Sequence, residues 1–199
     1  EANVFNTDRS YYAIRDALKT NDTGTFEKTI EFFPEEGKYH LDGHLSCNVR
    51  LTPEETRKLG GICPVCGRKV TVGVLYRVAE LANHPPGRRP KNARPFVNII
   101  PLPEILAETE GTGPASKKVQ SRYFDLLMKL GSEFTILLDT PLAEIESASN
   151  ARTAEAIDRM RKGTIRIDPG YDGEYGHASI WTDEEKSAAP KETPQASLF

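Results

Sequence analysis

His44-Leu45-Ser46-Cys47, followed after fifteen residues by Cys63-Pro64-Val65-Cys66, gives the chain the pattern H-x2-C-x15-C-x2-C. A gap of two residues lets one tight turn aim two side chains at a single ion, and zinc prefers four sulfur or nitrogen ligands in a tetrahedron. Pro64 stiffens the second turn, and Gly67 permits the sharp bend that follows it. The pattern predicts a zinc ribbon in which the structural Zn²⁺ has four protein ligands: His44, Cys47, Cys63 and Cys66.

The fourth ligand has more than one candidate. His44 is favoured because it has the two-residue spacing to Cys47, and His40 and Asp42 are the alternatives. Three cysteines cannot close on one another as a disulfide set, so they indicate thiolates held for a metal in a reducing, cytoplasmic compartment.

Two short helices are predicted beside these turns. Thr52 can cap the first helix, Pro53 suits its first position, and Glu55 completes a capping box. Gly60-Gly61 is expected to end it. A second short helix carries the apolar residues Val74, Val78 and Leu81.

The segment before the cysteines predicts one helix and one strand. Asp8 is the expected N-cap of a helix with an apolar face formed by Tyr12, Ile14 and Leu18. Residues 29–33 read as a strand. Because one helix and one strand cannot bury both faces of a sheet, residues 1–33 are interpreted as the remnant of an α/β barrel. The chain opens with Glu1 rather than Met, and we expect it to be part of a longer protein.

Charge is segregated along the chain, although the whole carries a net charge of only -3. Residues 1–67 have a net charge of -3, residues 68–122 of +6, and residues 133–199 of -6. A protein with a pI near 5.9 is not a general polyanion binder, but its middle third has the charge of one.

The basic middle third contains a turn suited to phosphate. A helix, a Gly-x-Gly turn and a second helix starting near Ser116 would bring backbone amides and a positive helix end to one point. This is the physics of a helix-hairpin-helix motif, which grips DNA phosphates without reading bases. The predicted DNA-binding residues are Arg88, Arg89, Lys91, Arg94, Gly111, Gly113, Ser116, Lys117 and Lys118.

The remaining chain predicts further short elements. Residues 141–161 resemble a second, degenerate helical hairpin without glycines, and residues 134–138 read as a strand. Residues 164–168 and 177–181 predict a closing β-hairpin around the turn at 170–173. The polar segment after 182 is expected to be disordered.

Composition and motif content exclude several classes of protein. No run approaches the roughly 18 apolar residues of a membrane span, and no secretory signal is present, so no membrane partner is expected. No nucleophile–base pair or catalytic metal cluster is evident. The acidic residues around the Gly-rich turn, Asp168, Asp172 and Glu174, lack histidine partners.

Several segments together resemble the endonuclease Q family of archaea and some bacteria, and no single motif carries the resemblance. They are residues 31–40 with Asp42-Gly43-His44, residues 61–67 with 71–75, residues 92–96, residues 100–105, Gly113-Pro114 with residues 116–119, and residues 170–176. The resemblance runs from residue 1 to about residue 181 and is to the C-terminal half of that family.

The resemblance implies a DNA repair enzyme that nicks on the 5′ side of uracil, hypoxanthine, xanthine or an abasic site. The chemistry of the family is attributed to an N-terminal metal-dependent phosphoesterase (PHP) domain, so the catalytic divalent metals are expected before Glu1. The resemblance also places His44, Cys47, Cys63 and Cys66 at the zinc-ribbon positions of the family, and residues 113–118 in its helical DNA-binding part.

The last five residues, Gln195-Ala196-Ser197-Leu198-Phe199, follow a polar, proline-containing linker. They resemble the peptide by which bacterial proteins dock on the DNA polymerase sliding clamp. In such a peptide Gln195 would fix the register by hydrogen bonding, while Leu198 and Phe199 would fill an apolar pocket.

The expected fold is α+β, with a zinc-ribbon module, a helix-hairpin-helix-like helical module and the barrel remnant. The expected domains are 1–33 (end of the PHP domain), 34–86 (zinc ribbon), 87–181 (helical DNA-binding domain) and 182–199 (tail with the clamp-binding peptide). The leading hypothesis is the DNA-binding half of a deamination-repair endonuclease that is inactive alone. The alternative is a non-enzymatic zinc-ribbon adaptor that links a DNA-processing partner to the clamp.

Overall fold

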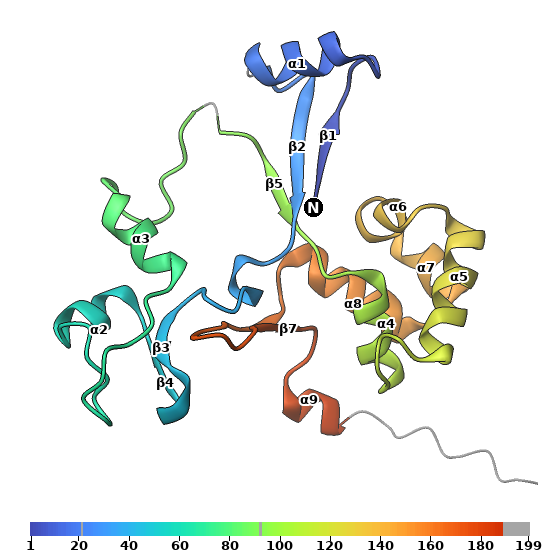
Figure 1. The fold of residues 1–199 in the computed structure, drawn as a ribbon. Helices are drawn as coiled ribbons and strands as arrows, with labels where there is room; N and C mark the ends of the chain where they lie inside the picture. Colours follow the sequence, from blue (N-terminus) through green and yellow to red (C-terminus); the bar gives the residue numbers. More distant parts are fainter. Residues whose placement is uncertain (21, 92, 189–199) are drawn as a thin grey trace, which may run out of the picture.

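A computed structural model describes residues 1–20, 22–91 and 93–188, and it divides them among three regions (Figure 1). A small sheet and one helix form the first region, at the top of Figure 1. Two short strands and two helices form the second, at the lower left. The third is a helical body on the right that holds most of the buried side chains.

The small sheet has the strand order β1-β2-β5 and joins distant parts of the chain. Strand β1 (Ala2–Phe5) runs antiparallel to β2 (Phe26–Glu31), and β5 (Phe96–Asn98) runs parallel to β2. The Phe5 and Phe26 rings stack with their centroids 4.7 Å apart. Strand β1 was not expected from the sequence, because four residues with a single alternation give almost no periodic signal.

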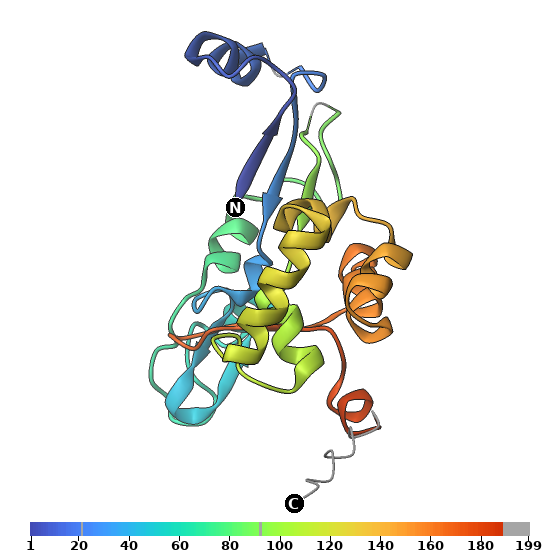
Figure 2. The same cartoon turned by 90° about the vertical axis from the view of Figure 1, so that its right-hand side faces the viewer.

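Helix α1 (Tyr11–Thr20) connects β1 to β2 and lies at the far end of the sheet (Figure 2). The Ser10 hydroxyl accepts the Ala13 N–H at 3.2 Å, so Ser10 rather than the expected Asp8 caps the helix. Ala17 is its only buried residue, and the apolar face predicted for this helix faces solvent.

The second region contains the antiparallel strands β3 (Asp42–His44) and β4 (Val49–Leu51), then α2 (Pro53–Lys58) and α3 (Val74–Leu81). The predicted capping box is present: Thr52 Oγ1 accepts the Glu55 N–H, and the Glu55 carboxylate accepts the Thr52 N–H. Only Leu51, Cys63 and Val70 form a buried apolar cluster here. A core of three side chains is too small to stabilise about 40 residues against their loss of conformational entropy.

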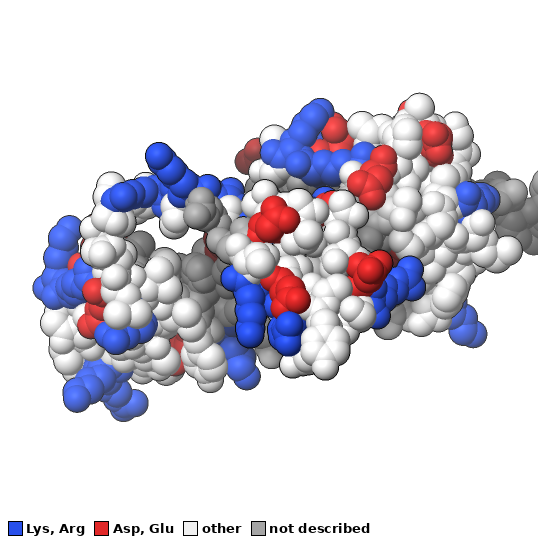
Figure 3. All heavy atoms as spheres, turned by 90° about the horizontal axis from the view of Figure 1, so that it is seen from above, with Lys and Arg blue, Asp and Glu red and all other residues white. Residues whose placement is uncertain are grey.

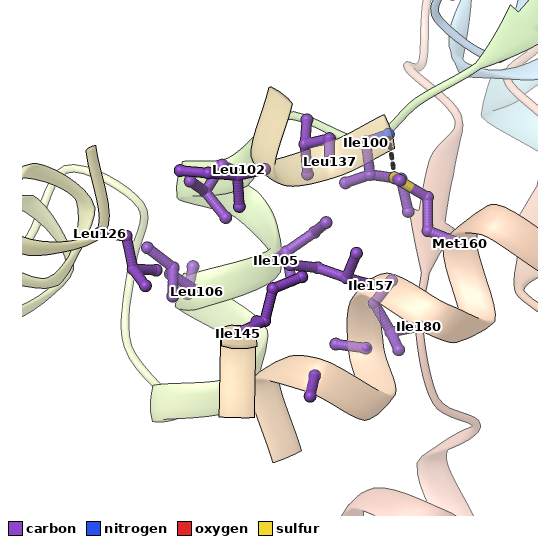
Figure 4. Close-up of a cluster of buried hydrophobic side chains, with 14 of the residues drawn as sticks. Ile100, Leu102, Ile105, Leu106, Leu126, Leu137, Ile145, Ile157, Met160 and Ile180 are labelled. Atoms are coloured by element: carbon purple, nitrogen blue, oxygen red, sulfur yellow. Dashed lines mark hydrogen bonds between the residues drawn. The ribbon is translucent and has the colours of Figure 1, made fainter. Parts of the chain in front are cut away.

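The helical body packs five helices around one core. They are α4 (Leu102–Glu110), α5 (Lys117–Leu130), α6 (Glu133–Leu138), α7 (Leu142–Ala148) and α8 (Ala151–Lys162). Leu102, Ile105 and Leu106 point from one face of α4 into the centre of this core (Figure 4). Ile100 starts the helical body, where its backbone N–H donates to the sulfur of Met160 on α8 at 3.3 Å. Each fully buried Leu or Ile contributes about 1.5–3 kcal/mol.

Helix α6 occupies the segment that was predicted to be a strand, and that prediction was wrong. At its start, the Ser132 hydroxyl accepts the Thr135 N–H at 3.2 Å. At its end, the Arg161 guanidinium donates to the carbonyls of Leu137, Ile136 and Thr140, each at 2.8 Å. A six-residue helix gains little from propensity, so these end contacts and burial decide its conformation.

The closing hairpin is confirmed and returns the chain to the second region. Strands β6 (Arg166–Asp168) and β7 (His177–Ser179) pair antiparallel, and α9 (Asp183–Ala188) follows them. The expectation of disorder after residue 182 was wrong for α9, because Thr182 and Glu185 cap the start of this helix by bonding to each other's backbone N–H. The loop between the strands packs on the 3-10 turn η1 (Pro34–Glu36): Gly170 N–H donates to Glu35 O at 2.8 Å, and Gly176 N–H donates to Glu36 O at 3.0 Å.

Substitution Arg161→Ala is expected to lower the free energy of unfolding of the helical body by about 2–3 kcal/mol, because hydrogen bonds from a charged donor to three α6 and post-α6 carbonyls are lost. Urea unfolding followed by circular dichroism measures the change. Lys162→Ala on the same helix is the control, since its ammonium pairs with Asp158 at the surface and its loss should cost under about 0.5 kcal/mol. Equal effects of the two substitutions would contradict the capping role of Arg161.

Candidate functional site

The four predicted metal ligands converge in the second region. His44, Cys47, Cys63 and Cys66 each present one ligand atom, and these atoms all lie within 4.8 Å of one another. Tetrahedral zinc with bonds of about 2.0–2.3 Å keeps its ligand atoms about 3.3–3.8 Å apart, so only small side-chain movements are needed to close such a site. The four residues could hold a metal ion, as the sequence predicts.

Two backbone turns bring the ligands together. The first follows β3 as the 3-10 turn η2 (Leu45–Cys47), and Asn48 ends it in the left-handed conformation at φ 51°. In the second, Cys63 N–H donates to Arg68 O at 2.7 Å and Gly67 N–H donates to Cys63 O at 3.0 Å. The His44 Nδ1 atom reaches to 3.4 Å from the Cys66 sulfur across the two turns.

The two alternative fourth ligands lie outside this cluster. Asp42 is fully buried, and its Oδ1 accepts the Gly73 N–H at 2.6 Å, so it anchors the start of α3. His40 contributes its backbone to the same junction, where its carbonyl accepts the Leu75 N–H at 3.1 Å. The geometry therefore agrees with the choice of His44.

The thiols of Cys47 and Cys63 have unequal proton affinities. Burial, with contacts to the Cys66 and Cys63 sulfurs, raises the pKa of the Cys47 thiol to about 11. Burial acts in the same direction on Cys63, but the backbone N–H groups of Cys66 and Val65 outweigh it and lower the pKa of Cys63 to about 7. Three sulfurs this close cannot all be thiolates unless a cation shares the space.

The predicted phosphate-binding turn lies between α4 and α5. Gly111 ends α4 in the left-handed conformation at φ 62°, and the Ser116 hydroxyl caps α5 by accepting the Val119 N–H at 3.3 Å. Within the described part of the chain, the N–H groups of Gly113, Ala115 and Lys117 donate to no protein acceptor. The turn thus presents free amides beside the N-terminus of a fourteen-residue helix.

The lysines at this turn differ in their surroundings. Lys118 forms an ion pair with Glu110 at 2.5 Å, and Arg122 contacts the same carboxylate at 3.3 Å. Lys117 is exposed, with no ion pair among the described residues. Of the two predicted lysines, only Lys117 offers an uncompensated charge.

The arginines of the 84–94 segment also differ. Arg88 contacts the His84 ring at 2.6 Å, and Arg89 lies over the Phe96 ring with its guanidinium 5.3 Å from the centroid. Arg94 reaches into the small sheet, where Nη1 donates to Phe26 O at 2.6 Å and the guanidinium covers the Phe26 ring. Arg94 therefore joins β2 to the segment before β5, whereas Lys91 is exposed to solvent.

Basic side chains are unevenly distributed on the face seen from above (Figure 3). They gather at the end of the molecule that carries α3, and they alternate with acidic side chains over the helical body.

The described residues contain no helix long and apolar enough to cross a membrane. Gln195, Leu198 and Phe199 of the predicted clamp peptide lie outside the described residues.

One exposed cluster of side chains has no role predicted from the sequence. Lys38, Tyr39 and Tyr175 lie together on the surface, with the Lys38 ammonium 5.6 Å and 5.5 Å from the two ring centroids. The residues are 137 positions apart at the extremes (38 to 175), so no local pattern could have joined them.

Comparison with known proteins identifies relatives of this chain. The family model described as the MJ0043 C-terminal domain matches residues 101–164. The uncharacterized protein MJ0043 of Methanocaldococcus jannaschii is 38% identical over 149 residues, which is 74% of this chain and 18% of that protein.

Two solved structures resemble the chain over almost its whole length. The lesion-specific endonuclease PfuEndoQ from Pyrococcus furiosus matches with a TM-score of 0.80 and 33% identity, over 94% of this chain and 46% of that one. Endonuclease Q in complex with a 27-mer duplex substrate, with an abasic lesion at its active site, matches with a TM-score of 0.77 and 34% identity over the same shares. The resemblance to the endonuclease Q family is confirmed, and the chain spans less than half the length of these relatives.

If the four residues hold a structural zinc, removing it is expected to unfold the second region, because the three-residue core there cannot replace the roughly 10 kcal/mol that such an ion supplies. Chelation or Cys66→Ser should therefore make residues 35–83 sensitive to protease, while the helical body keeps its resistance. Limited proteolysis with mass spectrometry tests this. Metal content should fall in His44→Ala and stay unchanged in His40→Ala. Retained protease resistance in the metal-free protein would contradict the prediction.

Proposed function

We propose that this chain is the DNA-binding portion of a repair endonuclease that acts at deaminated bases (uracil, hypoxanthine or xanthine) or abasic sites. The observation that carries the proposal is the structural match over 94% of the chain to a lesion-specific endonuclease, at 33% identity. A related structure holds a duplex substrate, and this chain spans 46% of that protein.

The free amides of the α4–α5 turn support a grip on DNA phosphates. Gly113, Ala115 and Lys117 present unpaired N–H groups, and the positive end of the α5 dipole adds to the charge of the Lys117 ammonium. The helical hairpin of α7 and α8 packs on the same core, as expected for a second, degenerate copy. These contacts position the duplex and leave the reading of bases to other groups.

The exposed face of α1 supports the assignment of residues 1–33 to a larger α/β domain of PHP type. Tyr11, Ile14 and Leu18 line one side of α1 and are largely open to solvent. In the described residues, β1 and β5 are both edge strands of their three-stranded sheet. An apolar helix face beside two open sheet edges is suited to packing against further strands and helices. In this proposal that domain holds the catalytic divalent metals.

The donor set supports zinc as the metal of the second region. Three sulfurs and one imidazole nitrogen match the preference of Zn²⁺, and four protein ligands leave no position for substrate. The proposed role of the ion is to fix the second region in place beside the helical body.

Equilibrium binding of the metal-loaded chain to duplex DNA tests the proposal. We expect binding that weakens with salt, and tighter binding to a duplex with one hypoxanthine or uracil than to its undamaged twin. Equal, salt-sensitive binding would assign lesion reading to the part of the relatives that this chain does not span. No binding at low salt would contradict the proposal and favour a zinc-ribbon adaptor.

In the same assay, Lys117→Gln is expected to reduce the slope of log K against log salt by about 0.9, the value for one phosphate contact. Lys129→Gln is the matched control on the other end of α5, where the ammonium donates to Ala148 O at 3.0 Å. An unchanged slope in Lys117→Gln would show that the α4–α5 turn lies away from the DNA.

We further propose that the chain docks on a DNA polymerase sliding clamp through Gln195, Leu198 and Phe199. Deletion of Leu198 and Phe199 should abolish binding to a bacterial clamp in surface plasmon resonance, because the apolar pair fills the clamp pocket. Binding to duplex DNA should survive the deletion. Unchanged clamp affinity, or no clamp binding by the intact chain, would refute this proposal.

A further inference from the structure

Two tyrosines and a lysine form a fixed cluster on the surface between the second region and the helical body. Tyr39 follows η1, and Tyr175 lies in the loop between β6 and β7. Both rings approach the Lys38 ammonium, with centroid distances of 5.6 Å and 5.5 Å. Contact of one cation with two aromatic rings is attractive in itself, and it brings the rings to a common point.

Backbone hydrogen bonds fix the two segments that carry the cluster. Gly173 N–H donates to Lys38 O at 2.9 Å, and Leu41 N–H donates to Gly170 O at 2.9 Å. Together with the hydrogen bonds that Gly170 and Gly176 donate to η1, these bonds hold the segments that carry Tyr39 and Tyr175 at fixed positions relative to each other. The rings are therefore presented on a backbone that is ordered before any ligand arrives, which lowers the entropy cost of binding.

The ring surfaces remain open. Tyr175 is 72% exposed and Tyr39 is 45% exposed, so each ring keeps area for a further contact. Lys38 forms no ion pair within the described part of the chain, although Glu35 is three positions before it and Glu174 directly precedes Tyr175 in the sequence. Exposed aromatic rings with an uncompensated cation between them offer stacking and charge at one place.

We propose that Lys38, Tyr39 and Tyr175 form a stacking site for an unpaired nucleobase of DNA. The rings take the flat face of the base, and the ammonium takes a neighbouring phosphate. A paired duplex covers both faces of its internal bases by stacking, so only a base that has lost its partner or left the stack can use the site. The inference rests on the proposed DNA-binding function and specifies one contact within it.

This site differs in kind from the α4–α5 turn. The turn supplies amides and charge, which bind any phosphate backbone equally. The tyrosine site distinguishes DNA with an exposed base from DNA without one, and it does so without reading the identity of that base. It therefore adds selectivity for distorted DNA.

Anisotropy measurements with two labelled duplexes test the site. One duplex carries a tetrahydrofuran abasic analogue opposite 2-aminopurine, and the other pairs 2-aminopurine with thymine. Tyr175→Ala and Tyr39→Ala are each expected to weaken binding to the abasic duplex about tenfold, which corresponds to about 1.4 kcal/mol. Binding to the paired duplex should stay within about twofold of the wild type.

Two further variants separate stacking from loss of structure. Tyr175→Phe keeps the ring and should retain wild-type binding and the wild-type decrease in 2-aminopurine emission, which Tyr175→Ala should lose. Tyr12→Ala is the matched control, because Tyr12 is 66% exposed on α1 and lies 5.0 Å from the Arg15 guanidinium. It should bind both duplexes as the wild type does, and circular dichroism and metal content should be unchanged in every variant.

The inference is overturned if Tyr175→Ala and Tyr39→Ala bind the abasic duplex normally, or if they lose affinity for both duplexes equally. In either case DNA binding by the wild type leaves the proposed function standing. Failure of the wild type to bind either duplex at low salt contradicts the proposed function itself, and the proposed stacking site is then rejected as well.

Discussion

The close approach of the 170–176 loop to residues 35–43 is the contact on which the arrangement of the molecule depends. A Cβ at Gly176 would lie 2.1 Å from the Glu35 carbonyl oxygen, and one at Gly43 would lie 2.4 Å from the Tyr171 ring. Only glycine allows the two backbones to come this close. The Tyr171 hydroxyl then donates to the Asn48 side chain at 2.9 Å, and Leu45 N–H donates to Asp172 Oδ2 at 2.6 Å. The loop thus contacts the turn that carries His44 and Cys47 directly.

The second region therefore has two sources of stability, and neither is an extended core. One is the metal that its four ligands could hold, and the other is the loop that belongs to the C-terminal hairpin. Arg50 on β4 strengthens the second source, because it pairs with Asp168 and covers the Tyr171 ring at 4.6 Å. Since the loop carries Tyr175 as well, the contacts that hold the metal turn also fix the proposed stacking site.

Local signals in the sequence predicted the parts of the fold that are decided locally. Thr52, Pro53 and Glu55 form the expected cap of α2, and the two cysteine turns bring four ligands together. The failures have distant causes. Residues 134–138 are helical because Arg161, more than twenty positions away, donates hydrogen bonds to the carbonyls at the helix end. Tyr39 and Tyr175 come together only because the 170–176 loop packs on residues 35–43. A contact between segments this far apart in the chain leaves no local pattern in the sequence.

Charge shows the same difference between sequence and structure. A net charge of +6 over residues 68–122 suggests one continuous anion-binding surface. In the folded chain Lys118 and Arg122 both form ion pairs with Glu110. Arg94 donates a hydrogen bond to the Phe26 carbonyl and covers the Phe26 ring. Among the described residues, Lys117 within this stretch and Lys38 outside it form no ion pair, and they lie beside free backbone amides and aromatic rings, respectively. Such points favour contacts of defined geometry over diffuse attraction, because each charge acts together with fixed amides or an aromatic face. In the proposed function, such points would hold DNA at a few set positions, which is the arrangement that a repair endonuclease needs if one strand is to be presented to its catalytic centre.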